Sequence, residues 1–150
     1  MVKVPFSASI GLLLVRIMLS VTFIYHGGQK LFGWFGGPGI KGFEGFISTM
    51  HLPILPTVVW ALMAAIAECI GGFALLPGFL SRFWALGLVI DMLMAIYVRR
   101  SAGLTGTELE QALMVLAAMI VLAGPGILSV DALLFRKPLW PNSRHVGKSQ

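Results

Sequence analysis

The sequence predicts an all-α fold, a transmembrane bundle of four helices that run up and down across a bilayer. Of the 150 residues, 57% are hydrophobic and only 11% are charged. A water-soluble domain usually carries about twice that share of charge, so this chain has too few charged side chains to cover a solvated surface. Apolar runs of about 20 residues can each cross a hydrocarbon core of about 30 Å, and four such runs nearly fill the chain. We expect one transmembrane domain over residues 1–137 and a polar tail over residues 138–150.

The first span is expected over residues 9–32, where Arg16 interrupts an otherwise apolar run. No clean small-x-small cleavage site follows this run, so we interpret it as an uncleaved span and not as a secretory signal. Residues 33–56 are rich in glycine, proline and aromatic residues. Glycine and proline argue against a long helix, and aromatic side chains suit the headgroup level. This connector is expected to be interfacial or partly re-entrant, with one short helix over residues 43–49.

Three further spans follow, each ended by residues that break or flank a helix. Proline cannot continue a helical hydrogen-bond ladder and glycine disfavours it, whereas arginines flank a spanning helix at the headgroups. These signals place the helix ends at Pro77-Gly78, Arg99-Arg100 and Gly124-Pro125-Gly126. The spans are expected over residues 57–76, 79–98 and 108–123.

Two local features surround the last span. Thr107 precedes it, and Glu110 stands three residues further on, so the pair is expected to form a capping box at the start of the helix. After the helix, residues 127–135 are expected to return along the surface as a short amphipathic segment.

The basic residues lie mainly between and beyond the apolar runs, and they give the chain a net charge of +5. That placement suits lipid headgroups better than a nucleic-acid groove, so no nucleic-acid partner is expected. More lysines and arginines lie on the side of the two termini, which predicts that both termini are cytoplasmic. The single cysteine, Cys69, excludes an intrachain disulfide and a CxxC redox pair.

Ionisable residues inside the predicted spans are the main functional signal. A charge at the bilayer centre costs roughly 2.5–3.5 kcal/mol, so these side chains should face the interior of the bundle. On the second span, Glu68 lies on a face of alanines and glycines, which lets helix backbones approach closely. We therefore expect each helix to offer one polar group to a common interior. These groups are Arg16, Glu68, Asp91 and Glu110.

Several roles are open for these residues. Glu68, Asp91 and His26 are candidate catalytic groups, and each has a structural alternative. Arg16 paired with Glu68 or Asp91 would simply fix the helix register, His26 would be an interfacial hydrogen-bond partner, and Lys30 would extend to the headgroups. The candidate ligand-binding residues are Arg16, His26, Lys30, Glu68, Asp91 and Glu110.

No metal site is expected from the spacing of potential ligands. A di-iron carboxylate bundle needs two Glu-x-x-His pairs, but Glu68 is followed at that distance by Gly71 and Glu110 by Leu113. Haem held by two histidines needs a facing pair within the bilayer, and only His26 lies near a span.

Short motifs recur in order along the chain: His26-Gly27-x-x-Lys30-Leu31-x-Gly33, Gly42-Phe43, Glu68-x-x-Gly71-Gly72, Gly78-x-x-x-Arg82, Asp91-Met92 and Gly124-Pro125-Gly126-x-x-Ser129-x-Asp131. Together they resemble the DoxX family over about residues 10–132. The resemblance implies a four-span protein of a bacterial or archaeal plasma membrane. It implies kinship with the membrane subunit of a thiosulfate:quinone oxidoreductase, and some members are described as scaffolds for membrane-bound redox assemblies. Carried over position by position, the matching polar residues are Arg16, His26, Lys30, Glu68 and Asp91.

Three functions are consistent with these features. The first is a quinone-linked subunit of a membrane redox complex, in which the quinone head lies near Arg16, His26 or Glu68 and a partner protein supplies electrons. The second is a non-catalytic membrane scaffold or assembly partner that uses the 33–56 connector and the basic tail. The third is a small proton-coupled transporter, which with four spans would require a homodimer.

Overall fold

The computed structural model of the chain describes residues 6–135, and all regular structure in this part of the chain is helical. This confirms the predicted all-α class; the tail predicted over residues 138–150 lies outside the described residues. Two single 3₁₀ turns, Trp34–Gly36 and Arg100–Ala102, supplement the α-helices. The α-helices are α1 (Phe6–Phe32), α2 (Gly39–Ser48), α3 (Thr57–Leu75), α4 (Ser81–Val98), α5 (Glu108–Ala123) and α6 (Val130–Leu134).

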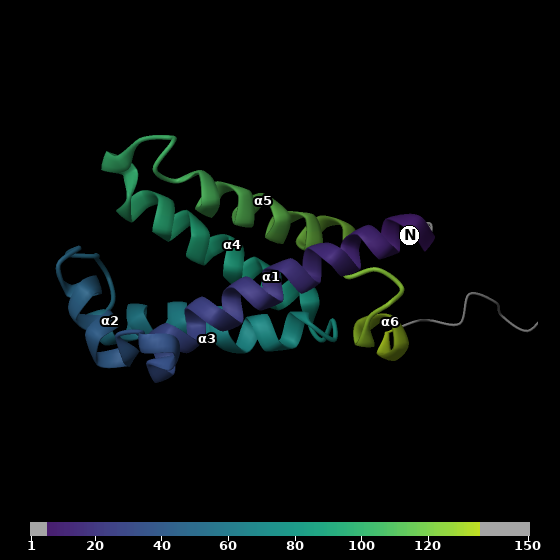
Figure 1. Cartoon of the computed structure of the whole chain (residues 1–150), viewed down its shortest axis with the longest axis horizontal. Coiled ribbons are helices and arrows are strands. Elements are labelled where there is room, and N and C mark those ends of the chain that lie inside the picture. The colour runs from purple at the N-terminus through teal and green to yellow at the C-terminus, as the bar shows by residue number, and fades with distance from the viewer. Residues whose placement is uncertain (1–5, 136–150) are drawn as a thin grey trace, which may run out of the picture.

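Three of these helices, α1, α3 and α4, are long and apolar enough to cross a membrane. Helix α5 has 16 residues, which span about 24 Å at 1.5 Å per residue, less than a hydrocarbon core of about 30 Å. It lies beside α4 as its antiparallel partner (Figure 1). The chain is therefore a multi-pass membrane protein, and a fourth crossing by α5 stays a prediction.

Most predicted helix ends agree with the structure to within a few residues, but the predicted cap of α5 is wrong. The Thr107 hydroxyl donates to the Gly103 carbonyl oxygen at 3.1 Å and makes no cap to the start of α5. Glu110 binds Arg99 and does not reach back to the backbone. Helix α2 also begins four residues earlier than predicted, directly after Pro38.

Helices α1 and α3 pack with their backbones almost in contact, because each helix places a glycine against the backbone of the other. A Cβ atom on Gly27 would lie 2.3 Å from the Cys69 backbone nitrogen, and one on Gly72 would lie 2.9 Å from that of Ile24. Small residues allow this approach between membrane helices. The predicted small-residue face of α3 is confirmed, and Glu68 is buried within it.

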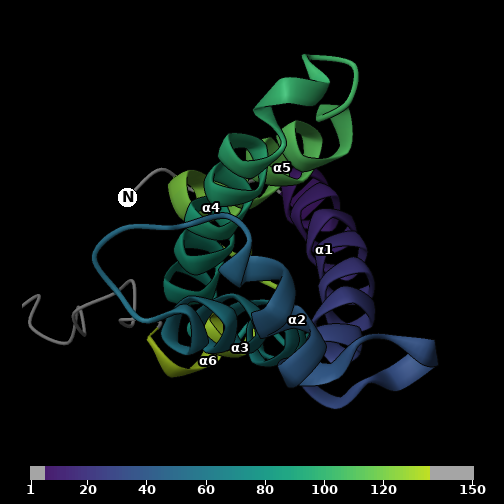
Figure 2. The same cartoon turned by 90° about the vertical axis from the view of Figure 1, so that its left-hand side faces the viewer.

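The two ends of the molecule are built differently. Helix α2 lies at one end, against the C-terminal part of α1 and the N-terminal part of α3, whereas α6 and the start of α1 lie at the other end (Figures 1 and 2). An apolar core fills the space between, where α1, α4 and α5 contribute buried side chains. The buried polar residues gather near the two ends, in two separate groups.

Candidate functional site

Arg16 belongs to the group at the α6 end, and it binds backbone carbonyls instead of a carboxylate. Its side chain is only 1% exposed. Nε donates to the Leu75 oxygen at 2.9 Å and Nη2 to the Leu76 oxygen at 2.6 Å. Nη1 donates to the oxygens of Pro125 and Leu128 at 3.1 and 2.6 Å. The predicted ion pair of Arg16 with Glu68 or Asp91 is therefore wrong.

Arg16 binds carbonyls because it lies at the end of α3, where the last backbone carbonyls have no hydrogen-bond partner within the helix. A guanidinium has five N–H donors, so one side chain joins this helix end to the loop that follows α5. Gly78 makes space for the Arg16 side chain, because a Cβ atom at this position would lie 2.7 Å from Nη2 of Arg16. Asp131 completes the group by accepting from the backbone nitrogens of Leu80 and Ser81 at 2.7 and 2.8 Å. This end of the molecule has a structural role.

The second polar group, near α2, is centred on an ion pair between α1 and α3. Lys30 Nζ lies 2.5 Å from Glu68 Oε1, and the two side chains are 26% and 2% exposed. Gly27 brings the two residues of this pair together, because its close contact with the α3 backbone places the next turn of α1 over Glu68. Nζ also lies 4.9 Å from the centre of the Phe43 ring. The expectation that Lys30 extends to the headgroups is wrong.

Asp91 of α4 adds a second carboxyl group to this pair. It lies near both Glu68 and Lys30, so its carboxyl group interacts electrostatically with these two side chains. Asp91 Oδ2 and Glu68 Oε2 are both buried without a hydrogen-bond partner. Two carboxyl groups thus share a single lysine.

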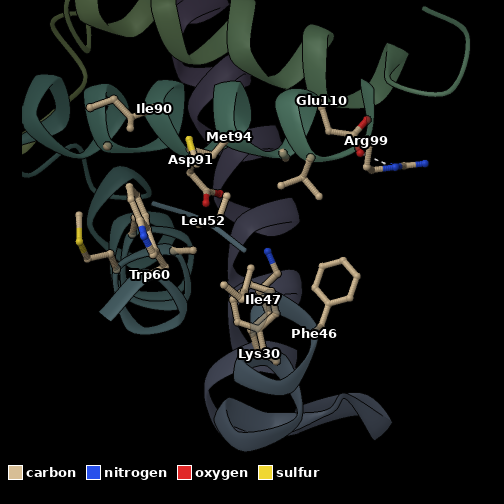
Figure 3. A pocket seen from close by; sticks show the side chains of 17 residues that line it. Lys30, Phe46, Ile47, Leu52, Trp60, Ile90, Asp91, Met94, Arg99 and Glu110 are labelled. Atoms are coloured by element: carbon tan, nitrogen blue, oxygen red, sulfur yellow. Dashed lines mark hydrogen bonds and ion pairs between the residues drawn. The ribbon is translucent and has the colours of Figure 1, made fainter. Parts of the chain in front are cut away.

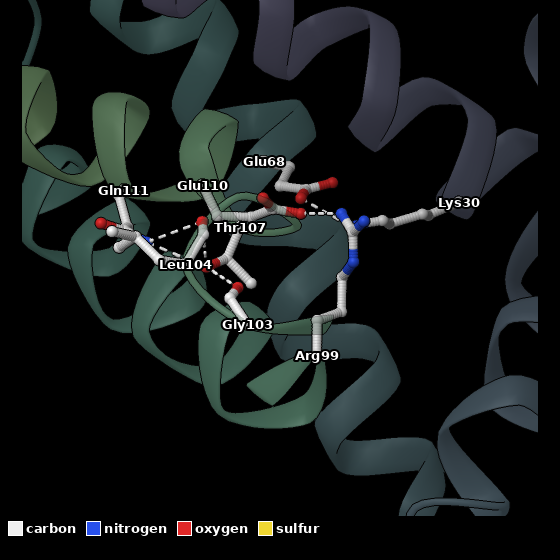
Figure 4. A network of polar contacts seen from close by, with 8 residues as sticks. All are labelled: Lys30, Glu68, Arg99, Gly103, Leu104, Thr107, Glu110 and Gln111. Atoms are coloured by element: carbon white, nitrogen blue, oxygen red, sulfur yellow. Dashed lines mark hydrogen bonds and ion pairs between the residues drawn. The ribbon is translucent and has the colours of Figure 1, made fainter. Parts of the chain in front are cut away.

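A third carboxyl group, that of Glu110, lies where α4 and α5 meet the connecting turn. It forms an ion pair with Arg99, whose side chain is 52% exposed, while Glu110 itself is only 12% exposed. Figure 4 shows this pair next to the hydrogen bonds that Thr107 and Gln111 make within the turn. Glu110 Oε2 is also buried and unpartnered.

Most of these charged residues line a cavity of about 340 Å³ that is otherwise apolar (Figure 3). Lys30, Asp91, Arg99 and Glu110 line it, and rings from α2 and α3 add an aromatic surface. Three of its apolar side chains are also exposed on the outer surface, so the cavity is open to the outside of the molecule. These three are Phe46, Met63 and Ile90. We call this cavity the α2–α3–α4 pocket.

The structure brings Lys30, Glu68, Asp91 and Glu110 together around the pocket but leaves two sequence candidates outside it. Arg16 is in the group at the other end, and His26 is exposed on α1 with its ring edge-on to Tyr25 at 5.4 Å between centroids. Sequence reasoning missed Arg99, which was interpreted only as a headgroup flank. Its spacing from Asp91, two steps of four residues, places both on one face of α4 and could have revealed it.

Within residues 6–135, no group of three or more histidine, cysteine, aspartate or glutamate side chains is placed to hold a metal ion.

Comparison with known proteins places these features in a wider group. The sequence model of the DoxX family matches residues 11–101. The chain is similar to the inner membrane protein YqjF of Escherichia coli strain K12, with 29% identity over 135 residues that cover 85% of this chain and 95% of that protein. No solved structure matches.

Proposed function

Because this chain belongs to the DoxX family, we propose that it is a multi-pass inner-membrane protein that binds a lipid-soluble quinone as a subunit of a membrane redox complex. The observation that carries the proposal is the α2–α3–α4 pocket, an open cavity with mostly apolar walls and a few ionisable groups among its lining residues. Ligand pockets have volumes of about 300–1,000 Å³ and combine apolar walls with a few placed polar groups. At about 340 Å³, this pocket has room for one ring-sized head, and a tail would leave through the opening.

The residues present fit such a head group. Trp60 and Phe43 offer ring surfaces to a flat ligand, and Lys30 and Asp91 offer a donor and an acceptor among the lining residues. Arg16 and His26, named in the sequence-based version of this hypothesis, have no place in it because both lie outside the pocket. When bound, a quinone supplies two-electron, two-proton redox chemistry.

The chain's own residues would bind and orient that head and manage protons near it. Asp91, which lines the pocket near Glu68, would bind the head group and exchange protons with it. The Arg99–Glu110 pair lies where the wall meets solvent, since Arg99 is half exposed. The only cysteine of the chain is Cys69, which cannot form a dithiol couple by itself, so electrons are assigned to a partner protein.

A blocking variant tests the proposal. A Cβ atom on Gly87, which lines the pocket, would approach no atom closer than the Ala67 Cβ at 3.8 Å. Gly87→Leu should therefore fill the pocket without a clash at its base. Titration of the purified protein with decyl-ubiquinone should quench tryptophan fluorescence through Trp60, and the affinity should fall at least tenfold in Gly87→Leu.

Gly11→Leu is the matched control, because Gly11 is exposed on α1 with open space around its Cβ position; it should bind like the unaltered protein. Equal quenching in all three proteins would mean that the quinone only partitions into the micelle, and the proposal would fail. That result would favour the scaffold alternative, which requires no ligand in the pocket.

A further inference from the structure

Lys30 uses only part of its hydrogen-bonding capacity inside the protein. A lysine ammonium has three N–H donors and no acceptor. Within residues 6–135, Nζ donates to one atom, Glu68 Oε1 at 2.5 Å, and it lies 4.9 Å from the centre of the Phe43 ring. These two contacts leave at least one N–H donor. The Lys30 side chain is 26% exposed and lines the α2–α3–α4 pocket, so a molecule in the pocket can reach this donor.

The amino group of Lys30 is directed into the pocket. In Figure 3 it points from α1 toward α4, among the apolar side chains that line the pocket. Arg99 also lines the pocket, but its Nη1 binds Glu110 and half of its side chain is exposed. We therefore take Lys30 as the donor that a head group meets inside the pocket.

The head group that accepts from Lys30 should be neutral. Two cations, Lys30 and Arg99, lie around the pocket together with three carboxyl groups, those of Glu68, Asp91 and Glu110. The positive charges do not exceed the negative ones even when one carboxyl group carries a proton. An anionic head would therefore find no surplus of positive charge in a cavity with mostly apolar walls, where like charges repel strongly. A carbonyl oxygen accepts a hydrogen bond without adding a charge.

We propose that the pocket recognises a neutral carbonyl group on a ring, and that Lys30 determines this specificity by donating a hydrogen bond to the carbonyl oxygen. The inference rests on the proposed function, since it assumes that the pocket binds a ring. It extends that function by separating rings that carry a carbonyl group from fatty acids and other anionic amphiphiles. Lys30 keeps its ion pair with Glu68 when the ligand binds, because the two contacts use different N–H groups.

The test compares para-pentylacetophenone with para-pentyl-α-methylstyrene, a hydrocarbon of the same shape in which a methylene group replaces the carbonyl oxygen. Calorimetric titration of the purified full-length protein measures both affinities, and the same titration of Gly87→Leu measures partitioning into the micelle. The ketone should bind about tenfold more tightly than the hydrocarbon, the effect of one hydrogen bond from a charged donor. Para-pentylbenzoate, as an anionic acceptor, should bind more weakly than the ketone.

Variants at Lys30 assign the preference. The double variant Lys30→Met/Glu68→Leu removes the donor without leaving Glu68 as an unpaired buried charge, and the preference should fall to about one. Lys30→Arg keeps the charge and the donors and should retain the preference. The matched control is Lys41→Met, since Lys41 is exposed on α2 and does not line the pocket; it should leave the preference at about tenfold. Infrared spectra of the unaltered protein need no variant at Lys30: the carbonyl stretch of the bound ketone should lie at lower frequency than that of the ketone in Gly87→Leu micelles.

The outcomes separate the two proposals. If neither the ketone nor the hydrocarbon binds better to the unaltered protein than to Gly87→Leu, the proposed ring-binding function fails. If both bind in the pocket but the hydrocarbon or the benzoate binds as tightly as the ketone, or the carbonyl stretch is not shifted, the carbonyl preference is overturned while ring binding stands. A preference that survives in Lys30→Met/Glu68→Leu overturns the assignment to Lys30.

Discussion

Replacement of Arg16 by leucine should cost a large part of the stability of the fold, although Arg16 touches no other ionised side chain directly. Its guanidinium donates to four backbone carbonyls at 2.6–3.1 Å, and the side chain is 1% exposed. The Leu75 oxygen also accepts from the Gly78 backbone nitrogen at 3.0 Å, so three carbonyls lose their donor. A buried acceptor that loses its donor costs about 1–3 kcal/mol, and three of them cost about 3 kcal/mol even at the lower end of this range. Proteins are commonly stable by about 5–15 kcal/mol, so this loss is large.

Reversible unfolding in mixed dodecyl maltoside and SDS micelles, followed by circular dichroism, measures the free energy of unfolding. Arg16→Lys, with three donors on a flexible stem, should lose about half as much as Arg16→Leu. The matched control is Arg82→Gln, since Arg82 is exposed and makes one 3.5 Å contact with a carbonyl; it should cost less than about 0.5 kcal/mol. If Arg16→Leu were no more destabilising than Arg82→Gln, the carbonyl contacts would not stabilise this end of the protein.

Three other predictions use the same unfolding assay. Lys30→Met and Glu68→Leu should be coupled, so the free-energy losses of the two single variants should together exceed the loss of the double variant by about 1–3 kcal/mol. The losses of Arg16→Leu and Glu68→Leu should instead add within about 0.5 kcal/mol. Coupling in the second pair and none in the first would mean that Arg16, and not Lys30, pairs with Glu68. Asp131→Asn should cost about 1–2 kcal/mol, because the carboxylate caps the start of α4, and an unchanged protein would show that the cap is dispensable. Gly27→Val should prevent close packing of α1 on α3, and a stable Gly27→Val protein would contradict the backbone contact.

Much of the fold could be predicted from the sequence because a bilayer imposes strong rules on length and polarity. Apolar runs broken by Pro77-Gly78 and Arg99-Arg100 gave helix positions close to those observed. The alanines and glycines around Glu68 predicted its burial, since a carboxyl group among small residues faces a neighbouring helix. These signals are local along the chain.

The pairing of the charged residues could not be predicted in the same way. Helical spacing places Arg16, Glu68 and Asp91 on inward faces but leaves their depth along the bundle open. Arg16 lies about four turns from Lys30 along α1, so it meets the end of α3, whereas Lys30 meets Glu68. Carbonyls at a helix end are an equally good partner for arginine, and no side-chain pattern in the sequence reveals them.

The most direct test of a ring-binding pocket is photolabelling with an azido-quinone in liposomes, followed by peptide mass spectrometry. The label should concentrate in peptides from α2, the first turns of α3 and the second half of α4, around Phe46, Trp60 and Met94. It should be lost in Gly87→Leu and kept in Gly11→Leu. Labelling spread evenly over the lipid-facing helices, or unchanged in Gly87→Leu, would show that this pocket does not bind the quinone.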